Sequence, residues 1–267
     1  MKPAIRLGAV GYLNARPLVF GLERSARVTL CYEAPSECAR LLHTGAIDAG
    51  IIPSIEYLRA GSYRIVPDVA IASYGPVASV ALYTRRPAGD IRSIAMDTSS
   101  RTSVALVHVL CARLFRIQPR IESHEPDLTA MLARCDAALL IGDKALVTGG
   151  SGPTEGGEVE KIDLGGAWTS MTGLPFVWAF WSGPPGALDA SDVALLQQAR
   201  DAGVGHAEAI AREHFHDSPE HHEMAARYLR DNIKYRLGAG ELAGLDLFFR
   251  YAAELGVVAT AREPQFY

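Results

Sequence analysis

Short apolar runs alternate with amphipathic stretches along the first two thirds of the chain. Runs such as "AGII" and "AALLI" suit strands that are covered on both faces of a parallel sheet. The stretches "YEAPSECARLLHTG" and "HEPDLTAMLAR" each place a proline just before an amphipathic helix, with Ser36 or Asp127 as the expected N-cap. Strands that alternate with helices in this way predict an α/β fold.

The same order of elements occurs twice. The segment "IRLGAVGYLNARP" from Ile5 resembles "IRSIAMDTSSRTS" from Ile91, and "IDAGIIPSIEYL" from Ile47 resembles "CDAALLIGDKAL" from Cys135. Chance similarity is the alternative, and it is the weaker one because four elements recur in one order. Two β-α-β-α-β lobes are therefore expected, with a ligand cleft where the carboxyl ends of their strands face each other.

Two Pro- and Gly-containing stretches mark the expected crossings between the lobes. The first follows "ASVALYTRR" near Pro87, and the second is "GPPG" after an aromatic strand. From Asp189 onward the apolar spacing becomes helical. We predict lobe I from residues 1–86 and 185–267, including the C-terminal helices, and lobe II from residues 87–184.

Charge and cysteine content narrow the function classes. The chain of 267 residues has 26 basic and 30 acidic residues, a balance that argues against nucleic acid as a partner. The N-terminal segment lacks the features of a signal peptide, and no apolar run approaches a membrane span. The four cysteines are widely scattered, which fits reduced thiols in a cytoplasm. The oligomeric state stays open.

A hydroxyl-rich turn is the first candidate for chemistry. Six polar residues follow a short apolar strand and precede a helix: Thr98, Ser99, Ser100, Arg101, Thr102 and Ser103. Helix capping explains one or two hydroxyls, and the surplus predicts an anion-binding loop at a helix N-terminus. Capping alone is the alternative. In the repeat, Asn14 of "GYLNARP" in the first lobe occupies the same position as Ser100 in the second.

Two further pairs of residues follow equivalent strands. Pro53 and Ser54 follow "AGII", and Gly142 and Asp143 follow "AALLI", so all four should stand at the cleft. Ser54 and Asp143 could equally cap the next helices. An acid beside an anionic ligand is unfavourable unless it is paired, and Lys144 is a possible partner for Asp143.

Two other patterns are weaker candidates. The segment "EHFHDSPEHHEM" contains four histidines, but a Ser-Pro turn divides them, so a polar helix end is favoured over a metal site. One expected strand contains four aromatic residues: Phe176, Trp178, Phe180 and Trp181. They could stack on a ligand, although packing in the core is favoured.

Seven stretches together resemble the chorismate dehydratases of the futalosine route to menaquinone. They are "GAVGYLNARPL", "SECARLLHTGAIDAGIIPSIEYL", "YRIVPDVAIASYGPVASVALYTR", "DTSSRTSVAL", "DAALLIGDKAL", "TGLPFVWAFW" and "YLRDNIKYRLGAGELAGLDLFFRYAAELG". The resemblance implies a two-lobed periplasmic-binding-protein-like fold of type II. It also implies a cytoplasmic lyase that converts chorismate to 3-[(1-carboxyvinyl)oxy]benzoate and water, without a metal or redox cofactor.

The resemblance also implies roles for particular residues. Asn14 matches the family's Tyr-Leu-Asn motif. Ser79 matches its Gly-Pro-Val-x-Ser pattern, which implies a catalytic hydroxyl in the cleft floor; an ordinary strand serine is the alternative. The hydroxyl-rich turn would bind a substrate carboxylate, which Arg101 either clamps or faces away from. Asn14 is a poor general base, so we expect it to position a substrate carboxylate that accepts the ring proton. A structural asparagine in a turn is the alternative.

Other function classes fit the sequence less well. A transport receptor of this fold ordinarily needs export, and a regulator's sensor domain needs a DNA-binding partner segment. The closest competitor is a sister lyase that acts on cyclic dehypoxanthine futalosine, whose first loop differs from "GYLNARP". A cytoplasmic protein that only binds a small anion is a further alternative.

Overall fold

Two mixed sheets, each of six strands, divide the chain in a computed structural model that describes residues 3–149, 152–154 and 157–267. The first sheet has the order β2-β1-β3-β12-β4, with β5 also beside β12. Its strands are β1 (Ile5–Val10), β2 (Val28–Glu33), β3 (Ala49–Pro53), β4 (Arg64–Ile65), β5 (Ile71–Ser73) and β12 (Phe176–Gly183).

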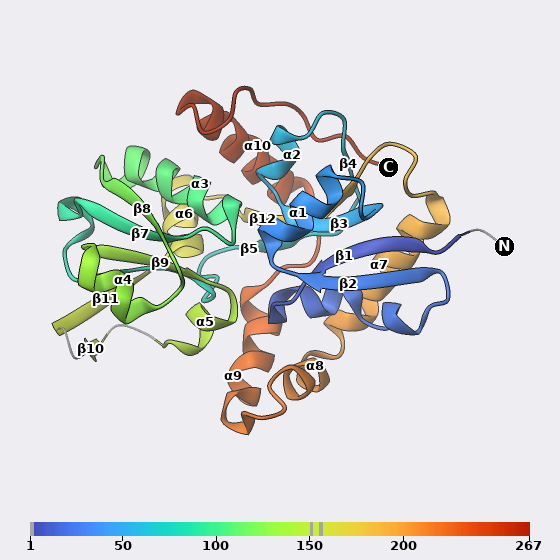
Figure 1. Ribbon diagram of the computed structural model, residues 1–267, viewed down its shortest axis with the longest axis horizontal. Helices are drawn as coiled ribbons and strands as arrows, with labels where there is room; N and C mark the ends of the chain where they lie inside the picture. Colours follow the sequence, from blue (N-terminus) through green and yellow to red (C-terminus); the bar gives the residue numbers. More distant parts are fainter. Residues whose placement is uncertain (1–2, 150–151, 155–156) are drawn as a thin grey trace.

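The second sheet has the order β10-β11-β6-β9-β7-β8. Its strands are β6 (Val80–Thr84), β7 (Ser93–Asp97), β8 (Arg120–His124), β9 (Ala137–Ile141), β10 (Gly152–Thr154) and β11 (Gly157–Asp163). Figure 1 shows the two sheets side by side along the longest axis of the molecule.

Strand pairing confirms the internal repeat. β1 pairs in parallel with β2 and β3, and β7 pairs in parallel with β8 and β9. In each sheet an antiparallel strand then follows the parallel trio: β12 beside β3, and β6 beside β9. The sheets of the two lobes thus share one topology, which places the carboxyl ends of β1 and β3 opposite those of β7 and β9.

The chain passes between the sheets earlier than the Pro- and Gly-containing stretches suggested. β6 lies before residue 87 but pairs with β9 and β11 of the second sheet, and β12 lies before residue 185 but pairs with β3 of the first. The predicted boundaries, 86/87 and 184/185, each lie one strand too late. They fall at turn residues, which mark the loop after a strand, whereas the sheet to which a strand belongs depends on its hydrogen-bonding partners. The extent of each lobe as a folding unit stays a prediction.

Helices cover both sheets. The helices inside the repeats are α1 (Pro35–His43), α2 (Glu56–Arg59), α3 (Arg101–Leu110), α4 (Leu128–Arg134), α5 (Gly142–Val147) and α6 (Leu164–Thr172). Short 3₁₀ and π turns complete them: η1 (Leu13–Val19), η2 (Leu22–Arg24), η3 (Ala88–Asp90) and η4 (Cys111–Phe115). Asp127 caps α4 as predicted, with its carboxylate 3.0 Å from the Ala130 N–H. Ser36 does not cap α1, because Pro35 already occupies the first turn and Ala34 is the N-cap.

The segment after Asp189 is helical, as its apolar spacing predicts, and its assignment to the first lobe stays a prediction. Its helices are α7 (Ala190–Val204), α8 (Ala207–His214), η5 (Pro219–His221), α9 (His222–Arg227), η6 (Tyr228–Asn232) and α10 (Ala239–Glu254). α7 packs directly on η1, where a Cβ at Gly203 would lie 2.1 Å from the Pro17 carbonyl oxygen. Glycine is therefore required for this close approach.

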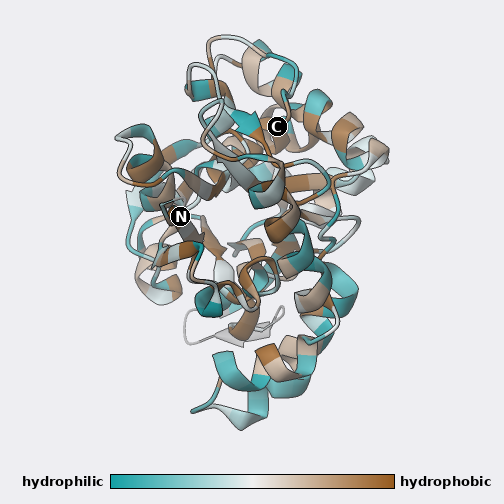
Figure 2. Cartoon of the chain, turned by 90° about the vertical axis from the view of Figure 1, so that its right-hand side faces the viewer, coloured by the Kyte–Doolittle hydropathy of each residue, from teal (hydrophilic) through white to brown (hydrophobic). Residues whose placement is uncertain are grey.

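The core lies on both faces of the sheets. β3, β7, β9 and β12 are buried along their whole length, and the four aromatic residues of β12 are all buried. Core packing is thus confirmed for Phe176, Phe180 and Trp181, whereas Trp178 also lines the cavity between the lobes. Hydrophilic residues gather on the outer helices in Figure 2. Among the described residues, no helix is long and apolar enough to cross a membrane.

Candidate active site

A cavity lies between the lobes at the carboxyl ends of the repeated strands. Its volume is about 40 Å³, and residues from both sheets line it: Val10, Tyr12, Asn14, Pro35, Pro53, Ile71, Val77, Val80, Ser100, Ser103, Ile141, Gly142, Trp178 and Ala179. The lining contains hydroxyls, an amide and apolar side chains but no charged side chain. Asn14, Pro53, Ser100, Ser103 and Gly142 thus lie where the repeat places them.

Tyr12 closes one side of this cavity. It precedes η1, and its ring lies over Gly142 of the other lobe, so that a Cβ at Gly142 would be 3.0 Å from three ring carbons. Gly142 also has a φ of +65°, a conformation that other residues rarely adopt. The Tyr12 hydroxyl is 3.3 Å from Ser99 Oγ, which makes a second contact between the lobes.

The hydroxyl-rich turn divides into residues that face the cavity and residues that do not. Ser100 caps α3, its Oγ is 3.0 Å from Ser103 Oγ, and both residues line the cavity. Thr102 is buried behind the wall, where its hydroxyl accepts the Ile55 N–H. Ser99 donates to Asp97, and Thr98 is exposed in a different pocket.

Arg101 points away from the cavity. Its guanidinium lies 2.8 Å from a carboxylate oxygen of Glu56, which is fully buried and also contacts Arg59 and His43. The geometry therefore favours the alternative in which Arg101 faces away from the cleft and does not bind the substrate carboxylate. The pair joins α3 of the second lobe to α2 of the first.

Ser79 lies directly behind the cavity wall, in the turn that leads into β6. It is 1% exposed, and its Oγ accepts a hydrogen bond of 2.7 Å from the Tyr228 hydroxyl. Burial raises the pKa of Tyr228, so this phenol stays protonated and acts as the donor. Ser79 does not line the cavity, so the structure does not bear out a serine hydroxyl in the cleft floor.

A carboxylate outside the cavity shapes the Ser79 turn. Asp163 accepts the N–H groups of Val77 and Ala78 at 2.9 and 2.6 Å, and it also caps α6. Ala78 has a φ of +65°, a strained value for a residue with a Cβ. These hydrogen bonds stabilise the strained turn and fix the position of Ser79.

Asp143 joins the lobes instead of facing the cavity. Its carboxylate accepts the Leu13 N–H at 3.0 Å and lies 2.7 Å from Nε2 of His214. The expected partner Lys144 instead donates to the Pro126 carbonyl. Ser54 is also turned away from the cavity, because its hydroxyl donates to the Val177 carbonyl at 2.8 Å. Neither side chain caps a helix.

One group of side chains has the donor types of a metal site. Glu122, His124 and Cys135 have ligand atoms within 4.8 Å of one another, on β8 and just before β9. None of them lines the cavity between the lobes. The C-terminal histidines do not converge in the described part of the chain, since His214 contacts Asp143 and His222 contacts the Phe215 carbonyl.

Comparisons with known proteins establish the family. The family model described as menaquinone biosynthesis matches residues 5–254. The chain belongs to the menaquinone biosynthesis family. A chorismate dehydratase of Thermus thermophilus is 33% identical over 265 residues, which cover 93% of this chain and 94% of the relative. A chorismate dehydratase of Campylobacter jejuni is 31% identical over 66% of each chain. The resemblance inferred from the motifs is confirmed.

Solved structures confirm the predicted fold class. Protein AF1704 from Archaeoglobus fulgidus has a TM-score of 0.73 and 16% identity, covering 96% of this chain and 99% of its own. The alkanesulfonate-binding protein SsuA from Xanthomonas axonopodis pv. citri has a TM-score of 0.68 and 15% identity, covering 96% and 94%. This menaquinone biosynthesis family member thus has a periplasmic-binding-protein-like fold.

Several residues around the site were not predicted from the sequence. Tyr12 stands inside "GYLNARP", so the motif itself was a signal for it. Tyr228, Asp163 and Glu56 come from distant segments, and nothing local marks them. His214 belonged to a histidine-rich stretch that was interpreted as a polar helix end, yet it holds Asp143 of the other lobe.

Proposed function

We propose that the protein dehydrates chorismate to 3-[(1-carboxyvinyl)oxy]benzoate and water. The observation that carries this proposal is the 33% identity with a chorismate dehydratase over 93% of this chain and 94% of the relative. The sister lyase that acts on cyclic dehypoxanthine futalosine is disfavoured, because the "GYLNARP" loop that distinguishes the two families lines the cavity through Tyr12 and Asn14.

The uncharged cleft fits the chemistry of this reaction. Loss of the 4-hydroxyl together with a ring proton makes the ring aromatic, so the reaction is strongly downhill and requires orientation more than strong acids or bases. Ser100, Ser103 and the N-terminal N–H groups of α3 can bind one substrate carboxylate. Fixed donors of this kind also stabilise the negative charge that develops as the proton leaves.

The proton transfer is assigned to the substrate itself. Asn14 lines the cavity, and as a neutral amide it can donate to a substrate carboxylate but cannot accept a proton at neutral pH. The carboxylate takes the ring proton and passes it to the departing hydroxyl as the ring C–O bond breaks, so that water leaves. Ser79, whose Oγ accepts a hydrogen bond from Tyr228 behind the cavity wall, is proposed as a positioning residue.

Substrate binding requires the lobes to separate. The cavity of about 40 Å³ is far below the roughly 300 Å³ at which small-molecule sites begin. Opening would break several contacts between the lobes, among them Asp143–Leu13, Asp143–His214, Tyr12–Ser99 and Arg101–Glu56. We therefore place lobe opening before substrate binding and lobe closure before the chemical step.

A cytoplasmic location is part of the proposal. Its support is chemical: the four cysteines are free thiols and three of them are buried, which fits a reducing compartment.

Incubation of the purified protein with chorismate and a metal chelator tests the proposed function. Chromatography and mass spectrometry should show loss of one water and formation of an aromatic enolpyruvyl ether. Unchanged chorismate in the presence of folded protein would contradict the proposal. Cyclic dehypoxanthine futalosine serves as the second substrate, and its turnover in place of chorismate would favour the sister lyase.

A further inference from the structure

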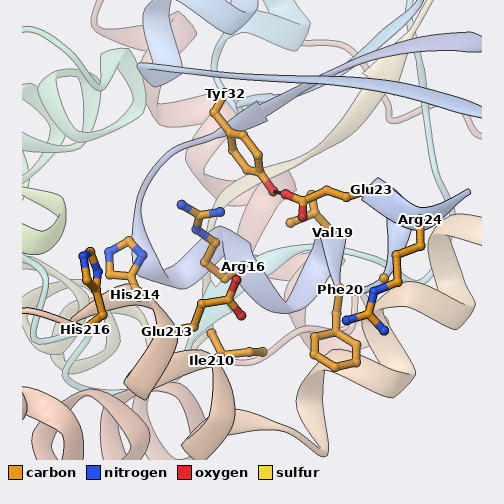
Figure 3. A pocket seen from close by; sticks show the side chains of 11 residues that line it. Arg16, Val19, Phe20, Glu23, Arg24, Tyr32, Ile210, Glu213, His214 and His216 are labelled. Carbon is orange, nitrogen blue, oxygen red and sulfur yellow. Dashed lines mark hydrogen bonds between the residues drawn. The ribbon is translucent and has the colours of Figure 1, made fainter.

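A second pocket opens on the outer side of η1, away from the cleft. Its volume is about 350 Å³, within the range of small-molecule sites. Figure 3 shows the side chains that surround it: Arg16, Val19, Phe20, Glu23, Arg24, Tyr32, Ile210, Glu213, His214 and His216. None of its lining residues lines the cavity between the lobes.

Arg16 dominates the upper part of this pocket. Its guanidinium carbon lies 4.4 Å from the centre of the Tyr32 ring, and its Nε is buried without a hydrogen-bond partner. Within the described part of the chain, no carboxylate oxygen lies within ion-pair distance of Arg16. An arginine that stacks on an aromatic ring and has no carboxylate partner is available to bind a planar anion.

His214 supplies a second unused polar atom. Its Nε2 is occupied by Asp143 at 2.7 Å, while its Nδ1 is buried and has no partner. Two buried, unsatisfied polar atoms on one pocket are unusual, because such atoms each cost free energy unless a ligand or water satisfies them. Both atoms belong to side chains that line this pocket, and this distinguishes it from an ordinary hollow in the surface.

The remaining lining defines the chemistry of that ligand. Val19, Phe20 and Ile210 provide an apolar wall. Glu23 already accepts the Tyr32 hydroxyl at 2.5 Å, and Glu213 lies near Arg16 in Figure 3. Two carboxylates beside the pocket disfavour a doubly charged phosphate and leave room for a single negative charge.

We propose that this pocket binds a small monocarboxylate with an apolar body, and that its occupancy stabilises the closed lobes. The carboxylate pairs with Arg16 and the body lies against Val19, Phe20 and Ile210. Asn14 of the cleft precedes Arg16 by two residues in η1, and His214 holds Asp143 of the second lobe. A ligand that orders Arg16 and His214 thus favours closure. This inference is independent of the reaction in the cleft.

Titration calorimetry with benzoate tests the site directly, without any measurement of activity. Arg16→Gln removes the charge and should weaken benzoate binding by about tenfold or more. Arg24→Gln is the matched control, because Arg24 is an exposed arginine on the same pocket and should change the affinity by less than about twofold. Benzoate is also the core of the proposed product, so the titration is repeated with Ser103→Ala, which alters the cleft. Binding to the second pocket should persist in this variant.

A second variant guards against loss of folding. Arg16→Lys keeps the charge and the stem but lacks the fork of donors, so it should also weaken binding while circular dichroism and Tm remain near those of the wild type. Benzoate should raise the Tm of the wild type more than that of Asp143→Ala, which has lost the link between the lobes. Absence of wild-type binding at millimolar benzoate would overturn the proposal. Three other results would also overturn it. They are an unchanged affinity for benzoate in both Arg16 variants, an equal loss of affinity in Arg24→Gln, and loss of benzoate binding in Ser103→Ala.

Discussion

The Tyr228 hydroxyl donates to Ser79 Oγ across 2.7 Å, and this hydrogen bond joins η6 to the turn that leads into β6. Tyr228 is 2% exposed and its pKa is raised by burial, so the phenol stays protonated. The hydrogen bond therefore fixes the position of Ser79 behind the cavity wall.

Tyr228→Phe removes this donor while preserving the ring. We expect kcat for chorismate to fall by about tenfold, because the Tyr228 hydroxyl contacts both Ser79 and Asn14 and its loss disturbs the position of both. The free energy of unfolding should fall by about 1 kcal/mol. Steady-state kinetics and urea unfolding measure the two effects.

Tyr83→Phe is the matched control for that variant. The Tyr83 hydroxyl is buried as well and donates to the Ala145 carbonyl at 3.1 Å, outside the cavity lining. Its loss should lower stability by a similar amount and leave kcat unchanged. An equal fall of kcat in both variants would show that Tyr228 contributes stability alone.

Asp143→Ala should weaken lobe closure. The Leu13 N–H and His214 lose their acceptor, so we expect KM to rise several-fold and the free energy of unfolding to fall by about 1–3 kcal/mol. Small-angle scattering should report a larger radius of gyration. Asp127→Ala, which removes the cap of α4, should lower stability by about 1 kcal/mol without changing KM. A normal KM in Asp143→Ala would contradict the proposed link.

Gly142→Ala combines a backbone cost with a steric one. The left-handed φ costs about 1–2 kcal/mol for alanine, and the new Cβ meets the Tyr12 ring. We expect kcat/KM to fall by more than about tenfold, because Tyr12 can no longer close the cavity. Gly45→Ala is the control: Gly45 has a φ of +70° but open space around its Cβ, so activity should persist. Similar activity in both variants would refute a role for the Tyr12–Gly142 contact.

The buried thiols of the folded protein should not react with thiol reagents between pH 8 and pH 9. Burial raises the pKa of both Cys38 and Cys111 to about 12, so the thiolate fraction at pH 8 is roughly a thousandfold below that of a free cysteine. Raising the pH to 9 should not make either thiol react with Ellman's reagent unless the protein unfolds. All four cysteines should react in urea, and rapid native labelling of Cys38 or Cys111 would contradict the fold.

The internal repeat made much of the fold predictable. Each lobe repeats short apolar strands and amphipathic helices, and Asp127 caps its helix as the local sequence indicates. The sheet membership of β6 and β12 was not predictable in the same way. Both strands are long apolar runs bounded by turn residues, and their pairing depends on partners far away in the chain.

The candidate site was predictable only in part. The hydroxyl-rich turn was found, but the rotation of a helix by about 100° per residue lets only positions three or four apart share one face. Ser100 and Ser103 have this spacing and line the cavity, whereas Arg101 and Thr102 contact Glu56 and Ile55. Partners such as Tyr228 and His214 could not be found without the tertiary structure, because they lie more than a hundred residues from Ser79 and from the turn.

Measurement of kcat/KM for chorismate in Asn14→Ala shows whether the reaction takes place in the cleft between the lobes. Thr98→Ala is the matched control, since Thr98 belongs to the hydroxyl-rich turn of the other repeat but is exposed and outside the cavity. If the cleft dehydrates chorismate, Asn14→Ala should lose about a hundredfold or more, Asn14→Asp should bind chorismate without turning it over, and Thr98→Ala should behave as wild type. Full activity in a folded Asn14→Ala variant would contradict the placement of the reaction in this cleft.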